Sequence, residues 1–127
     1  MTREAIQPDD LPVPTPPYSP VVVVGELVFT AGQVAMNRTG TIVDGGVAEQ
    51  TEQVLRNVAA CLAAAGCDMD DVVKTTVFLT DLADFPAFNE VYAQHFSSPY
   101  PARSTVQVGL AAGLLVEIEA VARRPVD

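Results

Sequence analysis

The clearest structural signal in the chain is one amphipathic helix with β-type sequence on both sides of it. Apolar residues recur at three-to-four spacing from Val47 to Ala65, which places them on one face of an α-helix. Glu49 and Glu52 lie in the early turns, where the helix dipole favours acids. Gly66 is placed to end the helix. The chain therefore combines at least one long helix with several strands.

The β-type runs lie before and after this helix. The stretch "YSPVVVVGELVFTAGQVA" holds two apolar runs around Gly25-Glu26, which predicts a hairpin. After the helix, "VVKTTVFLTDL" is too short and too rich in β-branched residues for a second helix, so it predicts a strand. The expected strands are the two runs of the hairpin, a short strand left open at Thr41 to Val43, and strands over Val72–Leu79, about Ala102–Val108 and about Leu114–Ala122.

A second, shorter helix is expected before the last two strands. Asp84 can cap it, and Pro86 is acceptable in its first turn. Its inner stripe consists of Phe85, Phe88, Val91 or Tyr92, and His95 or Phe96. The order β-β-(β)-α-β-α-β-β predicts an α+β fold in which a sheet carries two helices on one face. The opposite face is then either solvated or in contact with another subunit.

Length and composition predict one domain that hides apolar surface. The chain has 127 residues, one domain by length, and residues 1–17 are polar and Pro-rich, which predicts an irregular lead-in. Hydrophobic residues make up 49% and charged residues only 18%, which is low for a soluble monomer. This composition favours an oligomer.

Charge and the few special residues argue against several classes of function. The formal net charge is −9 and Arg123-Arg124 is the only basic pair, so no nucleic-acid partner is expected. No apolar stretch reaches the roughly 20 residues of a membrane span, and no signal-peptide pattern is seen, so we expect a cytoplasmic protein. Cys61 and Cys67 lie too far apart for a C-x-x-C pair or a zinc knuckle. We expect reduced thiols there, a helix-surface or packing role for His95, and no metal site.

The residues that carry chemistry gather in "YPARSTVQVGLAAGLLVEIEAVA", residues 100–122. Alternate residues of a strand share a face. If the two runs paired as a hairpin, Arg103 would lie opposite Glu119. Thr105 would then lie opposite Glu117 on the same face. From the pattern alone, a solvated face with an Arg–Glu pair worth about 0.2–1 kcal/mol is favoured. The functional interpretation is an Arg that grips a carboxylate in two hydrogen bonds, with an acid that orients or deprotonates water.

Several separate stretches resemble the RidA (YjgF, reactive intermediate deaminase) family, in that family's order. "YPARSTVQVGLA…VEIEAVA" resembles its C-terminal signature, and "PPYSPVVVVGELVFTAGQVA" resembles its N-terminal hairpin. "TEQVLRNVAACLAAAGCDMDDVVKTTVFLTDLADFPAFNEVYAQHF" resembles its helix–strand–helix middle, so the resemblance covers nearly the whole chain. It implies a chorismate-mutase-like α+β fold, with a mixed β-sheet and two helices on one face. It also implies a homotrimer with a central barrel and sites in the clefts between subunits.

The activity that this resemblance implies is hydrolytic deamination of enamines and imines. The substrates would be of the 2-aminoacrylate or 2-iminopropanoate type, giving a 2-oxo acid and ammonia without metal or cofactor. By similarity, Arg103 would bind the substrate carboxylate. Glu117, the first acid of "VEIE", would position the attacking water as general base, with a pKa set by burial against attraction to Arg103. The other implied binding residues are Tyr18, Gly32, Asn89, Ser104 and Thr105, the last two through backbone groups.

Three departures from the family pattern are visible. Ala31 stands where many relatives carry Ser, Thr105 stands where many carry Cys, and the loop at 109–115 looks shortened and lacks Arg-Leu-Pro. The first and third bear on substrate preference, and none removes the Arg–Glu pair. Within the deaminase hypothesis, the substrate could also be an aminoacrylate-type product of pyrimidine or aromatic breakdown. The alternative hypotheses are a non-catalytic trimer, either binding small carboxylates or chaperone-like, and an unrelated enzymatic role on the same scaffold.

Overall fold

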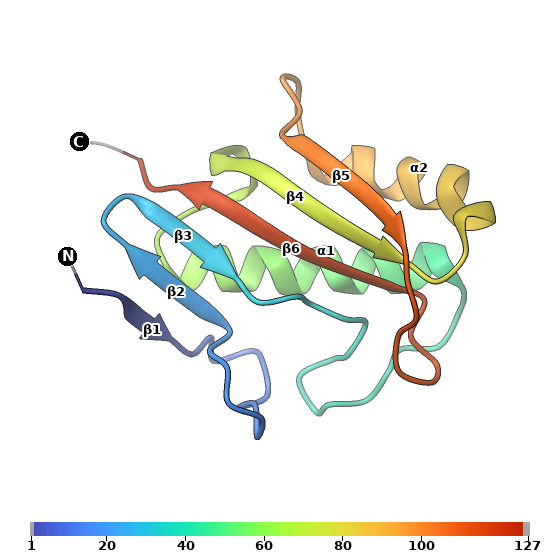
Figure 1. Ribbon diagram of the computed structural model, residues 1–127, viewed down its shortest axis with the longest axis horizontal. Coiled ribbons are helices and arrows are strands. Elements are labelled where there is room, and N and C mark those ends of the chain that lie inside the picture. The colour runs from blue at the N-terminus through green and yellow to red at the C-terminus, as the bar shows by residue number, and fades with distance from the viewer. Residues whose placement is uncertain (1, 126–127) are drawn as a thin grey trace.

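In the computed structural model, which describes residues 2–125, two helices cover one face of a six-stranded sheet (Figure 1). The strands are β1 (Glu4–Ile6), β2 (Val21–Val24), β3 (Leu27–Thr30), β4 (Val72–Leu79), β5 (Ala102–Gln107) and β6 (Val116–Arg123). The helices are α1 (Val47–Ala64) and α2 (Phe85–His95), and short 3-10 turns at Met69–Asp71 and Leu82–Asp84 precede β4 and α2. The predicted α+β class with both helices on one face is confirmed.

The predicted first hairpin and long helix are confirmed. β2 and β3 pair antiparallel around a two-residue turn, and Gly25 adopts a φ of 59° there, which glycine tolerates without a steric penalty. At the start of α1, the Gly46 backbone N–H donates to Glu49 Oε1 at 3.0 Å. At its end, Gly66 has a φ of 81°, as expected for a helix terminator. The open segment at 41–43 holds a single bridge, Met36 to Ile42, and no strand.

The lead-in is not irregular throughout, and this part of the prediction is wrong. Glu4–Ile6 forms β1, which pairs antiparallel with β2 at the edge of the sheet. Ile6 packs against the core, which the polar composition around it concealed. Pro8 has no N–H to donate to a ladder, so the strand ends before it.

The predicted hairpin between the last two strands is also wrong. The sheet order is β1-β2-β3-β6-β4-β5, with β5 parallel to β4 and β6 antiparallel to both β3 and β4. A parallel pair needs a crossover, and α2 supplies it between β4 and β5. Every second residue of β6 is buried, whereas β5 holds no buried residue. β6 therefore occupies an interior place in the sheet and β5 the edge.

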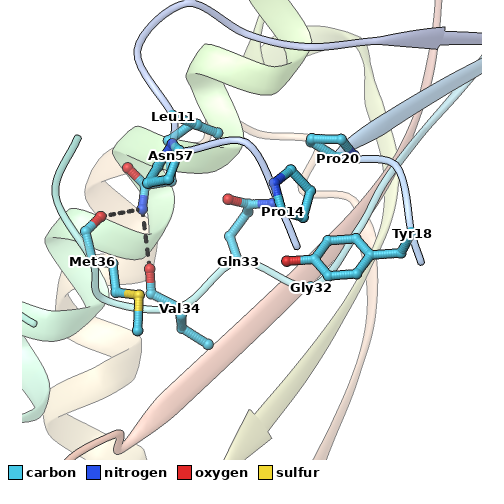
Figure 2. Close-up of a pocket in the computed structure, with 10 residues that line it drawn as sticks. Leu11, Pro14, Tyr18, Pro20, Gly32, Gln33, Val34, Met36 and Asn57 are labelled. Atoms are coloured by element: carbon cyan, nitrogen blue, oxygen red, sulfur yellow. Dashed lines mark hydrogen bonds between the residues drawn. The ribbon is translucent and has the colours of Figure 1, made fainter. Parts of the chain in front are cut away.

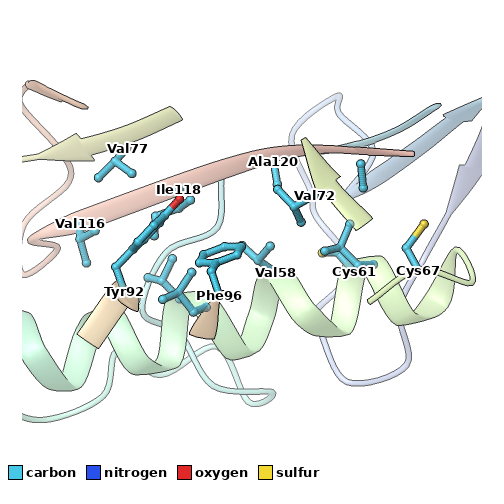
Figure 3. Close-up of a cluster of buried hydrophobic side chains, with 14 of the residues drawn as sticks. Val58, Cys61, Cys67, Val72, Val77, Tyr92, Phe96, Val116, Ile118 and Ala120 are labelled. Carbon is cyan, nitrogen blue, oxygen red and sulfur yellow. The ribbon is translucent and has the colours of Figure 1, made fainter. Parts of the chain in front are cut away.

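The core lies between the sheet and the two helices (Figure 3). Val58 of α1 and Tyr92 of α2 face sheet residues such as Ile118 there (Figure 3). Cys61 and Cys67 belong to this core and are both free, and burial raises the pKa of the Cys61 thiol to about 12. A thiol that stays protonated is a poor nucleophile, so the predicted pair of reduced, structural thiols is confirmed.

The sheet face that points away from the helices is partly apolar and uncovered. Leu27 and Phe29 of β3 are 42% and 40% exposed, and Val106 of β5 is 43% exposed. In β3, Leu27 and Phe29 alternate with buried residues on the helix side, such as Val28. We call this surface the open face.

Candidate functional site

The register of the sheet separates Arg103 from Glu117. Arg103 lies level with Thr75 of β4, which is fully buried under the helices. Glu117 lies level with Phe78, three residues further along the same strand. Because an odd step along a strand reverses the side-chain direction, Arg103 faces the helices and Glu117 the open face. The predicted grouping of these residues with Glu119 and Thr105 on one face is therefore wrong.

Ser104 and Thr105 follow the same alternation. Thr105 lies level with Val77, on the helix side, and its buried Oγ1 has no hydrogen-bond partner among the described residues. Ser104 points to the open face, where Lys74 Nζ donates to its Oγ at 3.5 Å. Among the described residues, β5 has a neighbouring strand on one side only, so backbone groups on its other edge can bond to a ligand or another chain.

Glu117 contacts Gly32, and Gly32 shares a cavity with Tyr18; we call these three residues the acid half. A Cβ on Gly32 would meet Glu117 Oε2 and lie 2.8 Å from its Cδ. The carboxylate therefore rests directly on the Gly32 backbone, where only glycine fits. Gly32 and Tyr18 also line a cavity of about 130 Å³ below the N-terminal loop, and the Tyr18 ring is directed toward Gly32 and Gln33 (Figure 2).

The acid half disfavours the charged form of its own carboxyl. Burial raises the pKa of Glu117, and the neighbouring Glu119 raises it further. The expected opposing attraction from Arg103 is not among these causes, because that guanidinium lies on the other face. A carboxyl of raised pKa is suited to take and return a proton near neutral pH.

Arg103 belongs to the second cluster, the arginine half, on the helix side. Its guanidinium carbon lies 4.8 Å from the ring centroid of Tyr92, 5.4 Å from that of Phe85 and 5.6 Å from that of Phe88. These are cation–π distances. Tyr92 is itself fixed by a 2.7 Å hydrogen bond between its hydroxyl and Thr75 Oγ1.

No carboxylate pairs with Arg103 within residues 2–125. The guanidinium instead lines an open recess of about 370 Å³. The recess is lined by Asn89, Tyr92, Ala93, Tyr100, Pro101 and Arg103. Asn89 thus lies beside Arg103, Gly32 lies against Glu117, and Tyr18 shares a cavity with Gly32, so the candidate residues form two groups and not one.

The sequence alone did not reveal the aromatic support of Arg103. Phe85, Phe88 and Tyr92 were expected only as the inner stripe of α2, and their spacing does place them on one stripe. Their contact with Arg103 depends on the parallel pairing of β5 with β4, which brings that strand under α2. The contribution of Tyr100 to the recess was likewise not anticipated.

Two further observations bear on the class of site. Among residues 2–125, no group of three or more His, Cys, Asp or Glu side chains is arranged to hold a metal ion. Across the same described part of the chain, none of the helices combines the length and the apolar character needed to cross a membrane.

Known proteins match nearly the whole chain. The family model described as endoribonuclease L-PSP matches residues 9–124. A human protein named 2-iminobutanoate/2-iminopropanoate deaminase is 45% identical, over 96% of this chain and 90% of the human protein. A crystal structure of RidA from an Antarctic Psychrobacter superimposes with a TM-score of 0.89 at 43% identity, covering 94% of this chain and 98% of that one. Escherichia coli TdcF with bound serine gives a TM-score of 0.89 at 41% identity, over 96% and 99%.

Proposed function

The chain belongs to the endoribonuclease L-PSP family, the family of RidA, and from this membership we propose that it hydrolyses small imino and enamino acids to 2-oxo acids and ammonia. Relatives about 45% identical carry the name 2-iminobutanoate/2-iminopropanoate deaminase. Substrates of the 2-aminoacrylate and 2-iminopropanoate type share a carboxylate next to the carbon that water attacks. A site for them needs a cation for the carboxylate and a base for the water.

The observation that carries the proposal is the guanidinium of Arg103 above an open recess, with no carboxylate of residues 2–125 paired to it. Three aromatic rings hold this group in place without neutralising its charge. A planar guanidinium matches a carboxylate in two parallel hydrogen bonds. In a chain with a formal net charge of −9, such a local positive group is what an anionic substrate requires.

Glu117 serves as the base in this proposal. The enamine first tautomerises to the imine, and water then adds to the imine carbon while Glu117 takes the proton that the water loses. Glu117 returns this proton to the nitrogen, which gives a carbinolamine. Glu117 then takes the proton of the new hydroxyl group and passes it to the same nitrogen, so that the carbon–nitrogen bond breaks and ammonia leaves as the carbonyl of the 2-oxo acid forms. The raised pKa of Glu117 favours the return of the proton.

The complete site requires two copies of the chain. The acid half lies on the open face and the arginine half on the helix side of the same sheet, so one chain cannot direct both at one substrate. We infer that the arginine half of one subunit meets the acid half of its neighbour, as in the homotrimer that the family resemblance implies. The apolar open face, with Phe29 and Val106 exposed, is the surface that such an assembly would bury.

A coupled assay tests the activity. 2-Aminoacrylate is generated from serine with a dehydratase, the purified protein is added, and pyruvate formation is compared with the spontaneous rate. We expect acceleration that is absent with Arg103→Ala while the assembly stays intact. Equal rates for Arg103→Ala and wild type would remove Arg103 from the site.

Subunit mixing tests the composite site. Arg103→Ala and Glu117→Gln are each expected to be inactive alone. After mixed refolding in equal amounts, roughly a quarter of the sites would combine an intact arginine half with an intact acid half. Recovery of activity to about that level is expected, and two variants that stay inactive in mixed assemblies would contradict a site shared between subunits.

Binding without turnover is the second candidate function. It is favoured by the relative TdcF, whose structure holds serine, a small amino acid with a carboxylate. A protein of this kind would retain 2-oxo acids through Arg103 and show no acceleration in the coupled assay. Calorimetric titration with pyruvate, beside the assay, separates the two functions.

A further inference from the structure

Two buried amide side chains of α1 hold the chain segments that carry the acid half. Gln50 and Asn57 are 2% and 6% exposed. They lie seven residues apart, which places them two turns apart on one face of the helix. Their hydrogen bonds do not reach Glu117 or Gly32 directly, and each instead bonds backbone close to one of the two.

Gln50 holds the loop that precedes Glu117. Its Nε2 donates to the Gly113 carbonyl at 2.8 Å, and its Oε1 accepts from the Leu115 backbone N–H at 2.8 Å. The Leu115 carbonyl accepts in turn from the Thr80 backbone N–H at 3.1 Å. Leu115 is two residues before Glu117, so the entry to β6 is tied both to the helix and to the end of β4.

Asn57 fixes the segment that follows Gly32. Its Nδ2 donates to the carbonyls of Val34 at 3.0 Å and Met36 at 2.8 Å (Figure 2). Its Oδ1 accepts from Gln53 Nε2 at 2.9 Å, which orients the amide. The same segment pairs with β6 where the backbone N–H of Gln33 donates to the Ile118 carbonyl at 2.8 Å. Gly32 is thus held between β6 and α1.

We propose that Gln50 and Asn57 are positioning residues that set the Glu117 carboxylate against the Gly32 backbone. Both contacts start from one helix, whose rise fixes their separation along the axis at about 10 Å. Helix α1 therefore fixes the position of the loop before Glu117 relative to the segment after Gly32. Small displacements of a reacting group are costly, since about 1 Å can lower a rate roughly a hundredfold.

This proposal rests on the proposed function, and its test separates the two. Gln50→Met and Asn57→Leu keep the side-chain size and remove the hydrogen bonds. Thr51→Val is the matched control, because Thr51 is fully buried on the same helix and its Oγ1 has no hydrogen-bond partner among residues 2–125. The readouts are kcat and KM in the coupled assay, thermal stability, and the pKa of the Glu117 carboxyl from its carbon NMR shift.

We expect each amide variant to lose about tenfold to a hundredfold in kcat with KM nearly unchanged, because the carboxylate is displaced while the arginine half is untouched. Loosening around Glu117 reduces its burial, so its pKa should move down toward the ordinary value, and Thr51→Val should change neither quantity. Amide variants that match Thr51→Val in both readouts would overturn the proposal. A loss of thermal stability with kcat and the Glu117 pKa unchanged would show that the two amides stabilise the fold and do not position Glu117.

The remaining outcomes are also decisive. If wild type shows no deaminase activity, the proposed function fails, but the Glu117 pKa in the variants still decides the positioning role. If Gln50→Met does not fold, Asn57→Leu carries the test alone. If neither variant assembles, the amides serve folding and the positioning role is rejected.

Discussion

The acid half and the arginine half of this molecule are placed by different means. The Glu117 carboxylate rests on the Gly32 backbone, and the loop before its strand is tied to α1 by the Gln50 side chain and to the end of β4 by a backbone hydrogen bond. Arg103 is held by side chains, on the rings of Phe85, Phe88 and Tyr92. The contrast extends to charge, because burial and Glu119 oppose the ionisation of Glu117, whereas the aromatic faces stabilise a cation.

This difference predicts two kinds of sensitivity. An atom added at Gly32 would displace the Glu117 carboxylate. The ionisation of Glu117 depends on how completely the surrounding residues exclude water. In the arginine half, binding of the substrate carboxylate depends on the shape and charge of the Arg103 guanidinium. Substitutions in the two halves should therefore separate into effects on turnover and effects on substrate binding.

The largest effect is expected for the base itself. Glu117→Gln should lower kcat by about 10²–10⁴-fold, the range typical of a lost general base, with a smaller change in the binding of a 2-oxo acid. Glu119→Gln is the control, because Glu119 is the neighbouring acid on the same face. It should keep kcat near wild type and move the acid limb of the pH–rate profile to lower pH, because it removes one cause of the raised Glu117 pKa. If Glu119→Gln lost more turnover than Glu117→Gln, the choice of base would be wrong.

Adding one methyl group to the acid half should cost nearly as much. Gly32→Ala forces its Cβ into the Glu117 carboxylate, so kcat should fall roughly a hundredfold through displacement of the base. Gly46→Ala is the matched control, since a Cβ there meets no atom within 4 Å. Steady-state kinetics and circular dichroism of both variants check the result. Full activity in Gly32→Ala would mean that the contact does not place the acid.

The arginine half is tested by changing the head group and keeping its charge. Arg103→Lys loses the planar fork, so kcat/KM should fall about tenfold to a hundredfold, mainly through KM, as expected when hydrogen bonds to a charged group are lost. Arg56→Lys, at an exposed position of α1, should leave both constants unchanged. A fall in kcat at constant KM would indicate that Arg103 acts on the transition state and not on the bound carboxylate.

The smallest effect concerns stability and pH. The folded-state pKa of Glu117 lies above its ordinary value of 4.5, so between these two values the folded state binds more protons than the unfolded state. Stability should therefore decrease as the pH rises from about 4.5 through the folded-state pKa. Glu117→Gln lacks this slope, so its melting temperature should exceed that of wild type near neutral pH and match it in acid. Parallel curves for the two proteins would contradict a raised pKa.

The local elements could be predicted from the sequence, but the pairing of the last strands could not. α1 and β4 have patterns that are complete within a few residues, such as the apolar stripe that starts at Val47. The place of β6 between β3 and β4 depends on contacts far apart in the chain, and alternation in β5 and β6 does not contain that information. The hairpin assumption consequently put Arg103 and Glu117 on one face.

The candidate residues were named by family resemblance, and geometry added their grouping. Arg103 and Asn89 line one recess, Glu117 rests against Gly32, and Gly32 and Tyr18 line one cavity. The support of Arg103 by aromatic rings and the amide contacts of Gln50 and Asn57 had no sequence signal, because each arises from packing between elements that the chain order does not relate. The catalytic roles of these residues are proposals, which the substitutions at Arg103, Glu117 and Gly32 test.

The placement of the two halves on opposite faces of one sheet also has a genetic consequence. In the proposed assembly, every subunit lends its acid to one neighbour and its arginine to the other. A chain with one damaged half spoils one cleft and still completes another with a normal partner. In a cell that carries both alleles, a defect in Arg103 and a defect in Glu117 would therefore complement each other inside single assemblies. A chain damaged in both halves would instead have a dominant-negative effect, because it inactivates two clefts at once.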